Sequence, residues 1–291
     1  MTEQMTEQKV ALMTGTSSGF GRLMAETFGR AGYRVFAGMR GTQGKNIEAR
    51  QHFEGLAKGG SAIEVVELDV TDDAGIEAAV AGILNTAGRI DVLVNNAGMS
   101  MATLSECATI EQAKLIFETN YFGPLRLCRA VLPQMRKQGN GFLIYVSSIG
   151  GRVALPNSAV YCGTKAAIEM LAEVQRYELA SLGIDVSILE PGAYATDIFD
   201  KMSYGADTLR MAEYGEIAAK VEQGMAAAKG YLASTQPNPQ EVADEALRLA
   251  EMAKGERPLR VLLGADAKML EPINATTGPL TQAMFQAFGF L

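Results

Sequence analysis

The sequence predicts an α/β protein built on a doubly wound parallel sheet. Short apolar runs rich in β-branched residues recur along the chain, and segments of helical pattern separate them. The runs are apolar throughout instead of alternating with polar residues, which is typical of strands that helices cover on both faces. No internal repeat or low-complexity linker divides the 291 residues, so we expect a single domain over 1–291.

Seven strands and six helices account for this alternation, and turn or capping residues mark several of their ends. Gly59 and Gly60 end the second helix, and Thr71 or Asp72 caps the third. The expected strands are Val10–Thr14, Arg34–Met39, Ile63–Leu68, Ile90–Asn95, Gly141–Ser147, Asp185–Leu189 and Arg260–Leu263. The expected helices are Gly21–Ala31, Asn46–Lys58, Asp72–Ala87, Ile110–Gln138, Ala159–Leu182 and Pro239–Lys254.

The alternation breaks after Tyr194, in a stretch rich in Met, Tyr, Ala and Gly with no expected strand. This stretch is too long for an ordinary loop, so we expect residues 194–235 to form a helical substrate lid. A tail follows over 265–291, and its end, Met284–Leu291, is expected to cover a neighbouring subunit or the chain's own pocket. The apolar and aromatic lid residues are Ile198, Phe199, Met202, Tyr204, Leu209, Met211, Tyr214, Met225, Tyr231 and Leu232.

Composition excludes several classes of protein. Apolar residues make up 48% and charged residues 20%, which excludes a disordered chain. The net charge of −7, without a basic cluster, argues against nucleic acid or an anionic membrane as the main partner. The charge-free stretch Pro272–Leu291 is a poor membrane span because it holds Pro279 and several amide side chains. Three cysteines without CxxC spacing, and no signal-peptide pattern, favour reduced thiols in a cytoplasmic protein.

A single histidine, His52, limits the chemistry that the chain can perform. Zinc sites of the His₃ or His₂Glu type cannot be built within one such chain, and we expect no metal site. A Ser-His-Asp or Cys-His site would have to recruit His52. Acid/base chemistry is therefore expected to use another group.

The glycine-rich loop over Thr14–Gly21, TGTSSGFG, stands between the first strand and the first helix. Its glycines allow a sharp turn and a close approach of the backbone to a pyrophosphate, which the helix N-terminus then binds, as in Rossmann-like folds. The same residues match GxSxG, the nucleophile elbow of hydrolases, with Ser17 as nucleophile. That alternative fails on the order of the triad residues along the chain, which is Ser, then Asp or Glu, then His. The only histidine, His52, lies in a polar helix soon after the first two strands.

The end of the second strand indicates which dinucleotide binds. About 20 residues past a glycine loop, an acid would bind the ribose 2′-OH of NAD. No acid occurs within residues 35–42, and Arg40 lies there instead. A guanidinium matches a 2′-phosphate in charge and geometry, and Ser17 can donate to the same phosphate. NADP(H) is therefore expected in preference to NAD(H), although Arg40 could also be a solvated loop residue.

Tyr161 and Lys165 are four residues apart at the start of a helix, so they share one face. A nearby ammonium lowers the pKa of a tyrosine, which supplies an acid/base group without histidine. Ser148 follows the fifth strand, at the sheet edge where open α/β folds bind ligands. Structural alternatives exist: Tyr161 could be a buried helix tyrosine and Lys165 a surface lysine. The neighbouring Ser147 is an alternative to Ser148.

Together these motifs resemble the short-chain dehydrogenase/reductase family, in its single-domain, NADP-preferring branch. Ser148-Ile149-Gly150-Gly151, Val160-Tyr161-Cys162 and Met39-Arg40 are most similar to the branch of 17β-hydroxysteroid and retinol dehydrogenases. The resemblance covers residues 10–197. It rests on Thr14–Gly21, Asp69, Asn95-Asn96-Ala97-Gly98, Asn120, Ser148, Tyr161-x-x-x-Lys165, Pro191-Gly192 and Thr196.

The resemblance implies a role for each matching residue. Tyr161 exchanges a proton with the substrate oxygen, Lys165 lowers its pKa and holds the nicotinamide ribose, Ser148 polarises the substrate oxygen, and Asn120 holds a water in a proton relay. The implied catalytic residues are Asn120, Ser148, Tyr161 and Lys165. The implied cofactor-binding residues are Gly15, Ser17, Ser18, Gly19, Phe20, Gly21, Arg40, Asp69, Val70, Asn96, Ala97, Gly98, Tyr161, Lys165, Pro191, Gly192 and Thr196.

The expected function is that of an NADP(H)-dependent oxidoreductase that interconverts a ketone or aldehyde and an alcohol on an apolar substrate. The family's dimer helices correspond to residues 110–138 and 159–182, so the resemblance also implies a homodimer or homotetramer. An alternative is a non-catalytic dinucleotide-binding regulator of the same fold. The complete set of Ser, Tyr, Lys and Asn residues argues against that alternative, because a sensor needs no proton relay.

Overall fold

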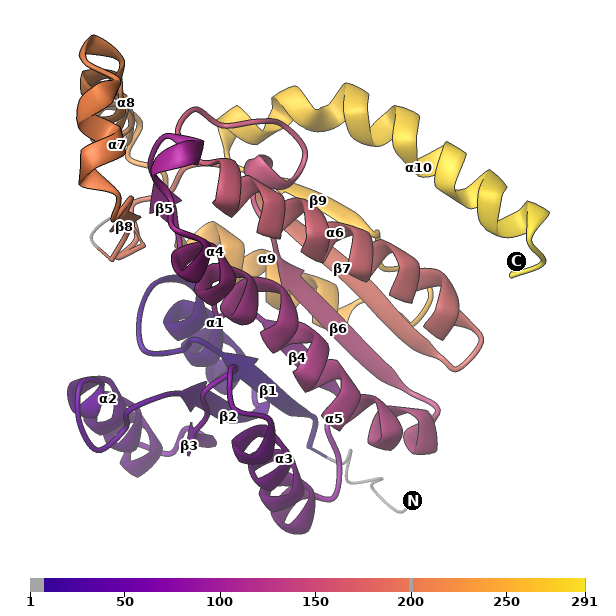
Figure 1. Cartoon of the computed structure of the whole chain (residues 1–291). Helices are drawn as coiled ribbons and strands as arrows, with labels where there is room; N and C mark the ends of the chain where they lie inside the picture. The colour runs from indigo at the N-terminus through magenta and orange to yellow at the C-terminus, as the bar shows by residue number, and fades with distance from the viewer. Residues whose placement is uncertain (1–7, 199–200, 291) are drawn as a thin grey trace, which may run out of the picture.

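The computed structural model describes residues 8–198 and 201–290. Seven parallel strands form one sheet in the order β3-β2-β1-β4-β6-β7-β9, so the predicted doubly wound sheet is confirmed (Figure 1). All seven expected strands are present, with ends that differ by a few residues. They are β1 Val10–Thr14, β2 Arg34–Met39, β3 Ile63–Glu67, β4 Val92–Asn95, β6 Gly141–Val146, β7 Ile184–Pro191 and β9 Arg260–Leu263.

Helices cover both faces of the sheet because neighbouring residues of each buried strand point to opposite sides. In β1, Ala11 and Met13 pack against one helical layer, and Val10 and Leu12 pack against the other. The first layer holds α1 Gly19–Arg30, α2 Ile47–Lys58 and α9 Gln240–Glu251. The second holds α3 Asp73–Ala87, α5 Gly123–Gln138 and α6 Ala159–Ala180.

The helix expected over 110–138 is not continuous. α4 covers Ile110–Phe117, a single π-helical segment covers Glu118–Phe122, and α5 follows. The physical cause is Pro124, which has no N–H to donate to the carbonyl of Asn120 and whose ring would collide with that carbonyl in a regular α-helix. Isolated π-helical turns of this kind are frequent at functional sites. Pro124 therefore alters the backbone at one of the predicted catalytic residues.

The segment expected to form the lid contains two helices, α7 Thr208–Glu213 and α8 Glu216–Thr235. It also contains a short strand, β8 Ser203–Tyr204, which pairs with β5 Met101–Ala102 and corrects the expectation of no strand here. Two paired residues leave no periodic pattern in a sequence, which explains the omission. Phe199, one of the expected lid residues, lies outside the described residues.

The chain beyond β9 begins with a 3₁₀ turn over Ala265–Leu270 and continues as the helix α10, Glu271–Ala287. α10 lies beside α6 at the rim of the molecule in Figure 1, and none of its residues is fully buried. Its contacts with the body are few, among them Phe285, whose ring stacks on Tyr177 of α6 at 4.2 Å. Within the described residues, no helix is long and apolar enough to cross a membrane.

We predict that Phe53→Ala lowers the free energy of unfolding by about 3–5 kcal/mol, because it opens a cavity under the second helix. Phe53 is the one fully buried residue of α2 and packs in the core that α1 and α9 share. Ile47→Ala is the control on the same helix, since Ile47 is 41% exposed and its loss should change stability by less than about 0.5 kcal/mol. Urea denaturation of both variants measures the difference, and equal losses would contradict the packing described for α2.

Candidate active site

Four neighbouring strands bring the predicted site residues to one edge of the sheet. β1, β4, β6 and β7 are adjacent and parallel, so their carboxyl ends lie side by side. The glycine loop leaves β1, Asn96–Gly98 leaves β4, Ser148 follows β6, and Gly192 follows β7. Open α/β sheets bind their ligands at such an edge.

The glycine loop turns sharply into α1, which begins at Gly19 and so starts two residues earlier than expected. Gly15 and Gly19 have φ angles of +68° and +55°, which disfavour a side chain. At Gly21, a Cβ would overlap the carbonyl oxygen of Gly15 and lie 2.5 Å from the amide nitrogen of Asn96. Ser18, the N-cap residue, makes no side-chain cap bond to the helix, so the loop presents N–H groups suited to an anion.

Asn96 and Thr14 tie the end of β4 to the glycine loop. The hydroxyl oxygen of Thr14 accepts from the backbone N–H groups of Asn96 at 3.1 Å and of Ala97 at 3.0 Å. The side-chain amide of Asn96 donates to the carbonyls of Thr14 at 2.9 Å and of Gly15 at 3.2 Å. Asn96 thus shapes the loop, and its amide donors are directed to the backbone of that loop.

Arg40 lies where the sequence predicts it, half exposed at the end of β2. Its Nη1 is 3.7 Å from Oδ2 of Asp69, the predicted adenine-side residue that stands next to Val70. Burial acts to raise the pKa of Asp69, but hydrogen bonds from Thr71 and the charge of Arg40 leave that pKa below its usual value. The cation and the expected adenine-side acid therefore form one cluster.

Glu67 is an acidic neighbour of this cluster that sequence reasoning missed. Its carboxylate accepts from the backbone N–H groups of Gly41 at 2.6 Å and of Thr42 at 2.8 Å, and from the hydroxyl of Thr42. No acid occurs within residues 35–42, but β2 pairs with β3 so that Met39 lies beside Glu67. The sequence signal that could have revealed Glu67 is an acid at the end of β3, the strand that pairs with β2.

Tyr161 and Lys165 lie together on α6, but their electrostatics differ from the expectation. Nζ of Lys165 donates to the carbonyl of Val146 at 2.8 Å and lies 5.7 Å from the centre of the Tyr161 ring. Burial raises the pKa of Tyr161 to about 12, although its hydrogen bond with Ser148 acts in the opposite direction. The ammonium of Lys165 donates to the carbonyl of Val146, and its expected effect on the pKa of Tyr161 stays a prediction.

Lys165 itself is almost fully buried, and burial lowers its pKa to about 8. The negative charge of Glu169 opposes this shift. Ser148 follows β6 at the N-terminus of the 3₁₀ turn Ile149–Gly151, where its hydroxyl oxygen accepts from the N–H of Gly150 at 3.1 Å. Ser148, Tyr161 and Lys165 are thus brought together as the sequence predicts.

Asn120 lies in the π-helical segment, buried behind these residues. Its side-chain amide exchanges hydrogen bonds with the backbone of Met99 at 2.8 and 2.9 Å, and donates to the hydroxyl of Thr164 at 2.9 Å. Thr164 in turn donates to the carbonyl of Tyr161 at 2.7 Å. The side chain is therefore occupied in fixing α6, and Pro124 cannot donate to the backbone carbonyl of Asn120.

The loop after β7 is held by a residue from the C-terminal tail. Oδ2 of Asp266 accepts from the N–H of Ala193 at 2.9 Å, and any Cβ on Gly192 would overlap the same carboxylate. Thr196 reaches back to the glycine loop, where its Cβ would be 3.5 Å from a Cβ built on Gly19. Pro191 is the last residue of β7. Sequence reasoning missed Asp266, which carries no motif and is distant along the chain.

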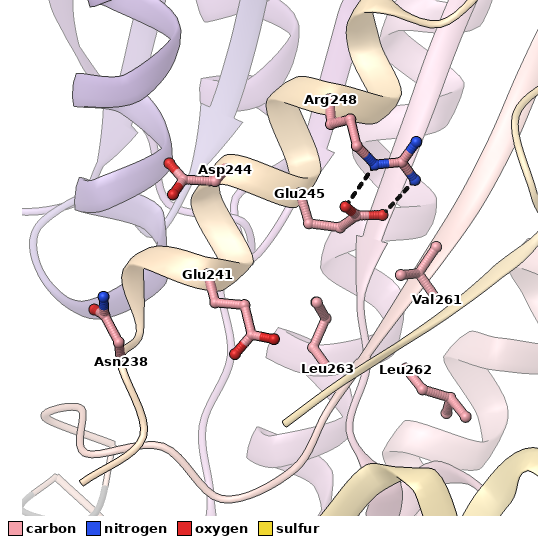
Figure 2. A pocket seen from close by; sticks show the side chains of 8 residues that line it. All are labelled: Asn238, Glu241, Asp244, Glu245, Arg248, Val261, Leu262 and Leu263. Atoms are coloured by element: carbon pink, nitrogen blue, oxygen red, sulfur yellow. Dashed lines mark hydrogen bonds and ion pairs between the residues drawn. The ribbon is translucent and has the colours of Figure 1, made fainter. Parts of the chain in front are cut away.

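A small pocket of about 190 Å³ is lined in part by Cys162, the residue that follows Tyr161 in α6. It lies between Thr103–Ser105, the residues 154–159 and Cys162, and Leu104 and Leu155 make part of its wall apolar. A larger groove of about 710 Å³ lies between α9 and β9, away from the catalytic residues, where Figure 2 shows the ion pair of Glu245 and Arg248. Among the described residues, no group of three or more His, Cys, Asp or Glu side chains could hold a metal ion.

Comparisons with known proteins match this chain to dehydrogenases and reductases. The family model described as short chain dehydrogenase matches residues 9–206. A 3-ketodihydrosphingosine reductase of Bacteroides thetaiotaomicron is 33% identical over 210 residues, covering 72% of this chain and 73% of the relative. A solved short-chain dehydrogenase from Streptomyces avermitilis is 33% identical, with a TM-score of 0.77 and 97% of each chain covered. A gluconate 5-dehydrogenase from Burkholderia cenocepacia, solved with NADP and tartrate, is 27% identical, with a TM-score of 0.61 over 65% of this chain and 73% of that one.

We predict that Gly21→Ala weakens binding of NADPH by about tenfold or more, because a methyl group at this position must displace the loop backbone. Gly82→Ala is the matched control, since a Cβ at Gly82 in α3 meets nothing within 4 Å. Titration of NADPH fluorescence measures both dissociation constants. Unchanged affinity in Gly21→Ala would show that this loop does not receive the dinucleotide.

Proposed function

This chain belongs to the short-chain dehydrogenase/reductase family, and we propose that it uses NADP(H) to interconvert an apolar ketone or aldehyde and the corresponding alcohol. Family membership makes it an oxidoreductase that acts on CH–OH and C=O groups. The single observation that carries the finer proposal is the position of Ser148, Tyr161 and Lys165 at the same sheet edge as the glycine loop.

The proposed proton transfer uses the hydroxyl groups of Ser148 and Tyr161. Both donate toward the substrate oxygen, Ser148 to polarise the carbonyl and Tyr161 to protonate it as the alcohol forms. When bound, the nicotinamide supplies the hydride. A pKa of about 12 keeps Tyr161 protonated at neutral pH, which is the form that reduction requires.

The proposed proton supply to Tyr161 involves Lys165 and Asn120. The ammonium of Lys165 lies over the ring of Tyr161, where it can hold the nicotinamide ribose and stabilise the phenolate left after proton transfer. The carbonyl of Asn120 holds a water that returns a proton from solvent. Asn120 and Thr164 keep this part of α6 in place.

The proposed preference for NADP(H) rests on Arg40. Its guanidinium is half exposed, so it is free to approach a 2′-phosphate, and its nearest acid, Asp69, is 3.7 Å away. Glu67 is already bonded to Gly41 and Thr42, which directs its negative charge to the loop backbone. NADP bound to the Burkholderia cenocepacia relative supports the same choice.

The proposed substrate is an apolar carbonyl compound or alcohol. The small pocket at Cys162 has apolar walls in Leu104 and Leu155. The segment 194–235 is the proposed substrate lid. The Bacteroides relative is named for a 3-keto substrate, which supports a ketone as the reacting group. The proposed assembly is a homodimer or homotetramer, supported by the exposed Leu280 and Met284 of α10. The proposed location is the cytoplasm, supported by the three free cysteines.

We predict that Tyr161→Phe lowers kcat for ketone reduction by about 100-fold or more while the dissociation constant of NADPH changes by less than about twofold. Tyr177→Phe is the control on the same helix, because the ring of Tyr177 stacks on Phe285 of α10 and its hydroxyl has no proposed role in the reaction. NADPH oxidation against a panel of apolar ketones provides the measurement. If wild type and Tyr161→Phe both bind NADPH and are inactive on every ketone, the regulator alternative gains.

We predict that Arg40→Ala raises the dissociation constant of NADPH by about tenfold or more, whereas that of NADH changes by less than about twofold. The physical reason is the loss of one charge-assisted hydrogen bond to the 2′-phosphate, a group that NADH lacks. Arg40→Lys should give an intermediate loss, since an ammonium keeps the charge without the fork geometry. Equal loss of both dinucleotides would remove Arg40 from phosphate recognition.

A further inference from the structure

Three buried glutamates lie on α6, which carries Tyr161 and Lys165, and on β7, which pairs with the strand before Ser148. Glu169 and Glu173 on α6 and Glu190 on β7 are only 2%, 3% and 0% exposed, and all three surround Arg260 of β9. Nη1 of Arg260 donates to Glu169 and, at 2.7 Å, to Glu190, and Nη2 donates to Glu173 at 2.7 Å. Buried carboxylates are costly unless they are paired, so this cluster calls for a physical explanation.

The cluster holds more acids than bases. Arg152 is the second guanidinium, with Nε 3.7 Å from Oε2 of Glu169, and Asn274 of α10 donates to Glu190 at 2.6 Å. Three carboxyl groups therefore share two arginines. Burial, and then the charge of Glu190, raise the pKa of Glu169 to about 7, although Arg260 acts in the opposite direction. Burial and the neighbouring carboxylate of Glu190 therefore both favour the protonated form of Glu169.

Glu169 is also the member that contacts the active site. Tyr161, Lys165 and Glu169 follow one another at steps of four residues, so they share one face of α6. Oγ of Ser147 donates to Oε1 of Glu169 at 2.7 Å, and Ser147 directly precedes Ser148. A Cβ on Gly151 would overlap this carboxylate and lie 2.8 Å from Oγ of Ser147. The 3₁₀ turn that contains Gly151 therefore packs directly on the hydrogen bond between Ser147 and Glu169.

We propose that Glu169 is a positioning residue for the catalytic site, whose carboxylate fixes Ser147, and with it the strand end that carries Ser148, and whose negative charge keeps Lys165 protonated. This inference rests on the proposed roles of Ser148, Tyr161 and Lys165. Glu169 acts through Ser147 and Lys165 and touches neither substrate nor cofactor itself. Glu173 shares the arginine but has no bond to Ser147, so it does not have this role.

A pH dependence follows, and its sign is set by the charge of Glu169. Burial lowers the pKa of Lys165 to about 8, and the ionised Glu169 limits that lowering. Removing the negative charge therefore lets Lys165 lose its proton at a lower pH, and the alkaline limb of the rate profile moves to lower pH. The charged groups that face Glu169 are Lys165 and Glu173 from α6, Glu190 from β7, Arg260 from β9 and Arg152 after the 3₁₀ turn.

The test compares Glu169→Gln with Glu173→Gln, since both lose a carboxylate on Arg260 and only the first loses the charge next to Lys165. We expect Glu169→Gln to move the alkaline midpoint of kcat/KM down by about 0.5–1 pH unit, and Glu173→Gln to leave it within about 0.2 unit. Glu169→Asp, which keeps the charge, should restore the wild-type midpoint. Ser147→Ala should lower kcat with no shift of the midpoint, because it removes the bond and leaves the charge.

Two further measurements separate this inference from the proposed function. The pH dependence of NADPH binding needs no substrate, and it should shift with Glu169→Gln because Lys165 holds the ribose. An unshifted profile in Glu169→Gln, or an equal shift in Glu173→Gln, would overturn the positioning role and leave a structural one. Full activity in Tyr161→Phe would instead overturn the proposed catalytic function, whatever Glu169 does.

Discussion

The carboxyl ends of β1, β4, β6 and β7 meet at one edge of the sheet, and the central part of the candidate site depends on that alignment. Parallel pairing in a fixed register makes the loops that follow these strands neighbours, although they are separated by many residues along the chain. Asn96 and Thr14 then join the first two loops through hydrogen bonds to backbone groups. The sheet therefore sets the spacing of the site, and the loops supply its chemistry.

Burial is the second influence on the site, because it raises the pKa of acidic groups and lowers the pKa of basic groups. It raises the pKa of Tyr161 and lowers that of Lys165, so both groups are displaced toward their neutral forms. The same effect raises the pKa of Glu169, one helical turn further along α6. Three titratable groups on one face of a helix thus respond to one physical cause, and their mutual charges decide how far each responds.

Sequence reasoning predicted most of the fold, and it named most of the residues that the structure brings to one edge of the sheet, because both leave local patterns. Apolar runs identify buried strands, glycines at 15, 19 and 21 identify a turn next to a helix, and the spacing of Tyr161 and Lys165 places them on one face. It joined α4 and α5 into one helix, although Pro124 was the available signal for the interruption. It did not anticipate that burial raises the pKa of Tyr161 to about 12.

The sequence by itself determined the seven main strands, the glycine loop and the spacing of Tyr161 and Lys165, because each depends on residues close together along the chain. Only the tertiary structure decided that Glu67 holds the loop after Arg40, that Asp266 holds the loop after β7, and that Arg260 gathers three glutamates behind Ser148. The physical reason is that these contacts join segments far apart in sequence, and burial, which sets their charge states, exists only after the sheet and its helices have packed.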